Sequence, residues 1–167
     1  MREFCRGLIA DLEGETHADA SETYAQHIPV HGICQLLGVP ETDADMYRDW
    51  IFRNFQLAPR DPKVRLQIME EMNAYNNRIL DERLAEPRDD MLSLIAHATI
   101  DGEPVSRELQ NGYVALMIIA GIDTTWSALG SGLWHFAQHA DQRAALVAVD
   151  DDDLLWNTAS EEVLRYY

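Results

Sequence analysis

The sequence predicts a mainly α-helical fold with at most one short β-hairpin. Apolar residues recur at helical spacing through almost every segment, and Gly or Pro residues separate those segments. A single Asp-Gly pair offers a hairpin turn. No internal repeat and no low-complexity linker interrupts the 167 residues. We therefore expect residues 1–167 to form one partial domain.

The composition is that of an ordinary globular protein, with 47% apolar and 25% charged residues. The formal net charge is −16 at pH 7, so the surface repels phosphate backbones and nucleic-acid binding is not expected. The two cysteines, Cys5 and Cys34, form no CxxC pair and no disulfide framework. These features indicate a reducing, cytoplasmic compartment.

Capping and helix-breaking residues mark the ends of the helices in the first half of the chain. Gly38-Val39-Pro40 ends one helix, Thr42 can cap the next, and Pro87 marks the end of a longer one. Pro29 is expected to bend or restart the helix that contains it. The expected helices span residues 2–12, 20–37, 42–55, 63–84 and 91–97.

The second half opens on the hairpin signal, Ile100-Asp101-Gly102-Glu103, in which Asp-Gly tolerates the positive φ of a type I′ turn. Ser106 can cap a long helix that continues to Gln138, and further helices are expected over 141–149 and from 154 to the end. The acidic run 150–153 is interpreted as solvated surface. The last helix has neither a Gly cap nor a Pro break, so we expect the chain to be truncated.

The long helix is apolar enough to raise the question of a membrane span. Between Tyr113 and Phe136 the only charged side chain is that of Asp123, and about 20 apolar residues suffice to cross a bilayer. A central Asp would cost roughly 2.5–3.5 kcal/mol on insertion. We therefore expect a buried central helix of a soluble protein, with no membrane contact.

One stripe of this helix carries only small side chains, at i, i+4, i+7 and i+11. Residues at these spacings lie on one face, so a flat or bulky group could approach the helix backbone closely there. The stripe consists of Ala120, Thr124, Ser127 and Ser131.

Polar residues enter the apolar helix abruptly beside this stripe. A buried carboxylate such as Asp123 is costly without a partner and often marks a functional site. Gly121 weakens the same turn, and the Thr124 hydroxyl can bond the carbonyl of Ala120 and loosen the helix. The residues alone leave two interpretations open: a helix that opens beside a reactive centre, or a packed helix whose Asp meets a basic partner.

The run Ala120-Gly121-Ile122-Asp123-Thr124-Thr125 resembles the oxygen-binding helix of the haem-thiolate (cytochrome P450) monooxygenases, and matches its Ala-Gly-x-Asp-Thr-Thr pattern in full. The resemblance implies haem b as cofactor and a proton-delivery role for Asp123 and Thr124, the expected catalytic residues. It implies that the haem is bound by Ala120, Gly121 and Thr124. It also implies a substrate pocket lined by Leu116, Met117 and Ile119.

Glu162-Val163-Leu164-Arg165 resembles the Glu-x-x-Arg helix of the same family. From spacing alone the pair is a common surface ion pair. The resemblance implies a structural role, in which Glu162 and Arg165 join a later partner in a buried network. Weaker matches agree in order with soluble bacterial members, among them residues 28–40, 89–93 and 134–143.

The chain departs from the family at the iron ligand. The Phe-x-x-Gly-x-x-x-Cys-x-Gly loop is absent, and neither Cys5 nor Cys34 has a comparable context. The N-terminal sheet region is missing as well. The i, i+4 histidine pairs have no further ligand in an evident constellation, so no metal site is expected in this chain.

The resemblance implies a haem-dependent monooxygenase that inserts one oxygen atom from dioxygen into a small hydrophobic organic substrate. Its electrons would come from a ferredoxin or reductase, and the 167 residues alone are expected to be inactive. Two alternatives remain: a non-catalytic all-helical interaction module, and a degenerate gene product of the same family.

Overall fold

The computed structural model describes residues 1–150 and 154–167. It is mainly helical, with one two-stranded antiparallel sheet, which confirms the predicted fold class. Residues 151–153, most of the acidic run interpreted as solvated surface, lie outside the described residues.

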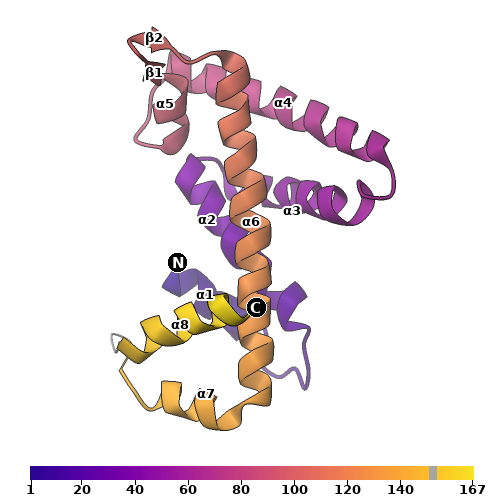
Figure 1. The fold of residues 1–167 in the computed structure, drawn as a ribbon, viewed down its shortest axis with the longest axis vertical. Helices are drawn as coiled ribbons and strands as arrows, with labels where there is room; N and C mark the ends of the chain where they lie inside the picture. The colour runs from indigo at the N-terminus through magenta and orange to yellow at the C-terminus, as the bar shows by residue number, and fades with distance from the viewer. Residues whose placement is uncertain (151–153) are drawn as a thin grey trace. The chain divides into compact units, whose positions relative to one another are not determined.

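The elements follow one another in the order shown in Figure 1. Most bounds agree with the sequence prediction to within two residues. In chain order the elements are α1 (Arg2–Ala10), the π-helical turn η1 (Ser21–Ala25), α2 (His27–Leu37), the 3-10 turn η2 (Glu41–Asp43), α3 (Ala44–Phe52), the π-helical turn η3 (Arg53–Leu57), α4 (Pro62–Ala85), α5 (Met91–Ala96), β1 (Thr99–Ile100), β2 (Glu103–Pro104), α6 (Arg107–Gln138), α7 (Ala140–Val147) and α8 (Leu154–Tyr166).

Local chemistry explains several of these boundaries. The Asp90 carboxylate accepts a hydrogen bond from the Ser93 N–H at 2.8 Å and so caps α5. Asp101 and Gly102 have φ values of 53° and 86°, as a type I′ turn requires, and Ile100 pairs with Glu103. The helix expected over 20–37 is divided into η1 and α2, so α2 restarts two residues before Pro29, as expected. Pro29 is tolerated in the first turn, where its missing N–H has no helical partner to lose.

The described residues divide into two compact units. The central unit comprises residues 29–123, and the terminal unit comprises residues 1–28 and 124–167. The assignment of residues 1–167 to one partial domain stays a prediction.

The central unit contains a closed apolar core. Its fully buried side chains come from α2, α3, α4, α5 and α6 and include Val30, Leu37, Tyr47, Ile51, Ile68, Leu80, Leu92, Val114, Ile118 and Ile122. The guanidinium of Arg83, which is 2% exposed, donates to Asp90 Oδ2 and to the Gly38 carbonyl, both at 2.6 Å. Arg83 thereby ties the end of α4 to the end of α2 and the start of α5.

The terminal unit has little buried apolar surface. Among its described residues, Ala25 and Leu146 are the buried apolar side chains. The indole N–H of Trp126 donates to Ser21 Oγ at 2.8 Å and links α6 to the N-terminal segment. Large apolar side chains that remain exposed are Ile9, Leu133, Trp134, Val147, Leu154, Leu155, Trp156, Leu164, Tyr166 and Tyr167.

The expectation that the long helix is buried on all faces is wrong for this chain. Within α6, only Gln110, Val114, Ile118 and Ile122 are buried. By length and composition α6 could cross a bilayer, and only 17% of its most apolar 18-residue window is buried. Its apolar character therefore reflects one buried stripe together with a large exposed apolar surface.

Candidate functional site

The predicted haem-facing residues lie on the exposed side of α6. An α-helix turns by about 100° per residue, so residues at i and i+4 share a face and those at i and i+2 point in roughly opposite directions. Ala120 and Thr124 are both exposed, whereas Ile118 and Ile122, two residues before each, are fully buried. The stripe continues with exposed Ser127. Ala120 in the central unit, and Thr124 and Ser127 in the terminal unit, are thus each accessible on α6, whereas Ser131 is half-buried.

Gly121 lies about 100° around α6 from Ala120 and faces α2. A Cβ atom placed on Gly121 would lie 2.7 Å from Ile33 Cδ1 and 3.4 Å from Ile33 Cγ1. The absence of a side chain is therefore needed for α2 to approach α6 at this turn. This is a packing role, and the assignment of Gly121 to cofactor binding stays a prediction.

Asp123 is half-buried, one position before Thr124 on the same helical turn. Within the part of the chain that the structure describes, no Lys, Arg or His side chain forms an ion pair with its carboxylate. The basic partner required by the packed-helix interpretation is therefore not found among these residues. Asp123 keeps access to solvent at the edge of the small-residue face.

The residues predicted to contact substrate precede the motif on the same helix. Leu116 is 61% exposed and lies one turn before Ala120, on the same face. Met117 and Ile119 are half-buried on either side of that face. Large apolar side chains therefore precede the small-residue stripe along α6.

Glu162 and Arg165 form the predicted pair on α8. The Arg165 guanidinium donates through Nε to Glu162 Oε2 at 2.7 Å and through a terminal nitrogen to Oε1 at 2.6 Å. This bond to Arg165 lowers the pKa of the Glu162 carboxyl below its ordinary value. The two side chains are 62% and 67% exposed. The buried network implied by the resemblance therefore stays a prediction.

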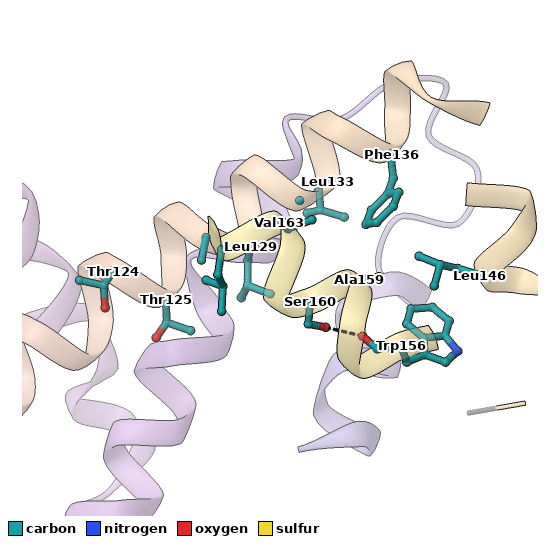
Figure 2. Close-up of a pocket in the computed structure, with 13 residues that line it drawn as sticks. Thr124, Thr125, Leu129, Leu133, Phe136, Leu146, Trp156, Ala159, Ser160 and Val163 are labelled. Carbon is teal, nitrogen blue, oxygen red and sulfur yellow. Dashed lines mark hydrogen bonds between the residues drawn. The ribbon is translucent and has the colours of Figure 1, made fainter. Parts of the chain in front are cut away.

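Sequence reasoning missed an apolar cavity in the terminal unit, shown in Figure 2. Its volume is about 530 Å³, and its walls come from the second half of α6, from α7 and from α8. The signal that could have found it is the i, i+4, i+7 spacing of Leu129, Leu133 and Phe136 on α6. The lining residues are Thr124, Thr125, Ala128, Leu129, Gly132, Leu133, Phe136, Leu146, Trp156, Ala159, Ser160, Val163 and Leu164.

The two cysteines, Cys5 and Cys34, lie in different surroundings. Cys34 is fully buried, and burial together with the nearby carboxylates of Asp43 and Glu41 raises the pKa of its thiol to about 11. Cys5 lies on α1. No group of three or more His, Cys, Asp or Glu side chains suited to a metal ion occurs in the described ranges.

The histidines of the terminal unit are engaged with one another and with neighbouring helices. The rings of His135 and His139 are stacked, with centroids 4.1 Å apart. The ring nitrogens of His135 lie 3.0 Å from the Tyr167 hydroxyl and 2.8 Å from Gln142 Oε1. His135 therefore links α6 to α7 and to Tyr167, the residue that follows α8.

Comparisons of the sequence with known proteins agree on one family. No protein-family model matches the chain. The chain is 35% identical over 167 residues to the vitamin D(3) 25-hydroxylase of Pseudonocardia autotrophica, covering 99% of this chain and 40% of the relative. It is 35% identical over 169 residues to the cytochrome P450 monooxygenase PikC of Streptomyces venezuelae, covering 99% and 39%.

Solved structures give the same result for the fold. The cytochrome P450 PksS of Bacillus subtilis superposes with a TM-score of 0.87 at 27% identity, covering 98% of this chain and 42% of that structure. The cytochrome P450 of Chondromyces apiculatus superposes with a TM-score of 0.82 at 28% identity, covering 99% and 40%. The chain spans about 40% of the length of the curated relatives it matches. Sequence and fold agree over nearly every residue, and the chain belongs to the cytochrome P450 family.

Proposed function

We propose that this chain provides the oxygen-activation helix of a haem-dependent monooxygenase that inserts one oxygen atom into a small hydrophobic organic substrate. The observation that carries the proposal is the exposed small-residue face of α6, with Ala120 and Thr124 accessible and Asp123 half-buried at its edge. The relatives named as hydroxylase and monooxygenase support it.

Ala120 and Thr124 are proposed to rest against one face of haem b. Their small side chains leave room for a planar ring, which a row of large residues would exclude. When bound, haem supplies the activation of dioxygen at its iron. A thiolate ligand would come from a residue other than Cys5 and Cys34, since Cys34 is buried as a neutral thiol and Cys5 has no matching motif.

Asp123 and Thr124 are proposed to move protons to the reacting oxygen. The half-buried Asp123 carboxylate can take a proton from solvent and rotate toward the exposed face. The Thr124 hydroxyl, which can both donate and accept, would hold the proton or a water at that face. Leu116, Met117 and Ile119 would present apolar surface to the substrate.

Several partners follow from the proposed activity. The electrons would come from a ferredoxin or a reductase, and we propose a cytoplasmic location without membrane or nucleic-acid contact. In a protein of the relatives' length, we propose that Glu162 and Arg165 become part of a buried supporting network. The 167 residues alone are proposed to show no thiolate-type Soret band on reduction with carbon monoxide, and no monooxygenase activity.

A chimera tests the proposed function. Residues 1–167 would replace the matched 40% of the vitamin D(3) 25-hydroxylase, giving the "hydroxylase chimera". We expect the chimera to bind haem and hydroxylate, and Asp123→Asn and Thr124→Val each to lower product formed per electron pair by about tenfold or more, with peroxide appearing instead.

Thr125→Val is the matched control, because it makes the same change at the adjacent hydroxyl, turned by about 100° around the helix. Its product yield should stay close to that of the parent chimera. A chimera that loads haem yet couples electrons to product equally well with Asn at 123 and Val at 124 would refute the proton-delivery role.

A further inference from the structure

The side chain of Ile33 in α2 packs against Gly121, in the turn of α6 that carries Asp123. Ile33 is 8% exposed, and its Cδ1 atom lies where a side chain of Gly121 would be. Val30 and Leu37, which share its face of α2, are fully buried. The side chain of Ile33 therefore fills a notch that only glycine leaves open.

This notch lies at a helical turn that glycine weakens. Glycine in a helix interior costs roughly 0.5–1 kcal/mol relative to alanine. The N–H of Thr125 bonds the Gly121 carbonyl in a regular helix, so opening at Gly121 would displace Asp123 and Thr124 first. The contact with Ile33 lies about 100° around the helix from exposed Ala120.

We infer that Ile33 is a positioning residue for Asp123 and Thr124: its Cδ1 methyl braces the Gly121 turn of α6 and sets how readily that turn opens. The inference rests on the proposed function of those two residues. Ile33 itself touches neither substrate nor cofactor. It acts through the backbone of Gly121, and a shorter side chain should release the turn.

Hydrogen–deuterium exchange of the 167-residue chain tests the brace directly. In Ile33→Ala we expect exchange of the amides of residues 121–125 to rise by about tenfold relative to wild type, because local opening becomes easier. Ile51→Ala is the matched control, since Ile51 is also a buried isoleucine (1% exposed), in α3. It should change exchange in this segment by less than about threefold.

A compensating pair separates bracing from general loss of packing. Ile33→Val removes Cδ1, so the Cβ of Gly121→Ala would then meet its nearest Ile33-derived atom at 3.4 Å in place of 2.7 Å. The double variant should return exchange of residues 121–125 to near the wild-type rate, although each single change raises it. Equal exchange in Ile33→Ala and Ile51→Ala, or no recovery in the double variant, would overturn the inference.

The hydroxylase chimera adds a second measurement, the product formed per electron pair, which would not change if Ile33 had only a structural role. There Ile33→Ala should lower product per electron pair while leaving the substrate KM unchanged, and the Ile33→Val, Gly121→Ala double variant should restore it. Unchanged coupling in Ile33→Ala would overturn the positioning role. If Asp123→Asn has no effect in the chimera, the proposed function fails, and the exchange experiment still decides whether Ile33 braces the turn.

Discussion

The two compact units differ sharply in how they treat apolar side chains of the same kind. The central unit buries leucine, isoleucine and valine residues from five helices, and it encloses the Arg83–Asp90 ion pair at their margin. The terminal unit leaves many large apolar side chains exposed, and it contains a cavity of about 530 Å³. Helix α6 contributes to both, with a buried stripe in one and a cavity wall in the other.

This difference shows that the spacing of apolar residues along a helix predicts where an apolar face lies. It does not predict whether other residues of the same chain pack against that face. In the central unit the apolar faces of the helices pack against one another, so the stability of this unit should depend on internal contacts. The terminal unit leaves much of its apolar surface exposed, so its stability should depend less on internal contacts.

The largest effect should come from the buried ion pair of the central unit. Arg83→Ala leaves Asp90, 7% exposed, without its cation, and should lower the free energy of unfolding by about 3–5 kcal/mol in urea titrations. Arg78→Ala removes the exposed pair with Glu82 on the same helix and should cost only about 0.3–0.5 kcal/mol. Similar losses in the two variants would contradict the account of the central unit.

Replacing large side chains of α6 by alanine should show the same difference between the two units within one helix. Ile118 is fully buried in the central unit, so Ile118→Ala should cost about 2–5 kcal/mol. Leu129 is half-buried at the wall of the open cavity, and Leu129→Ala should cost less than about half of that, because solvent already reaches the site. Thermal or urea unfolding of the two variants measures the difference, and equal costs would show that the cavity wall is packed as tightly as the core.

Acid should weaken the central unit through Asp90. Burial alone would raise the pKa of this carboxyl, but the Ser93 N–H and the Arg83 guanidinium hold the pKa below its ordinary value. Because the folded-state pKa is lowered, this stabilisation is present above the ordinary Asp value of about 3.9 and is lost as the pH falls through the folded-state pKa. As the pH falls, the urea midpoint of Asp90→Asn should therefore drop less steeply than that of the wild type. Parallel plots of urea midpoint against pH for the two proteins would contradict this role of Asp90.

The smallest effects, of opposite sign, are expected from two glycines of α6. Gly130, in the terminal unit, has open space where a Cβ would lie, so Gly130→Ala should stabilise by about 0.5–1 kcal/mol through helix propensity. Gly121→Ala should lose that gain, because its Cβ would meet Ile33 Cδ1 at 2.7 Å, and should be net destabilising by up to about 1 kcal/mol. A stabilising Gly121→Ala would show that α2 does not press on α6.

The sequence predicted the elements well because their signals are local. Asp101-Gly102 specifies its turn through backbone preference, and Ser106 and Pro87 mark helix ends by hydrogen bonding and ring geometry. The contact of Gly121 with Ile33 and the burial of Arg83 could not be predicted, since each depends on a residue more than forty positions away. The exposed face at Ala120 and Thr124 was predicted as a stripe of small side chains, but its accessibility depends on tertiary packing.

The central claim is that the α6 face at Ala120 receives a flat cofactor, and haem loading of the hydroxylase chimera tests it most directly. Ala120→Phe places a large ring on this exposed face, and Ala137→Phe places the same ring at an exposed position near the end of α6. The account predicts that Ala120→Phe folds with unchanged helical circular dichroism but loads less than about one tenth of the parent's haem, whereas Ala137→Phe loads it normally. Equal haem loading by the two variants would contradict the claim.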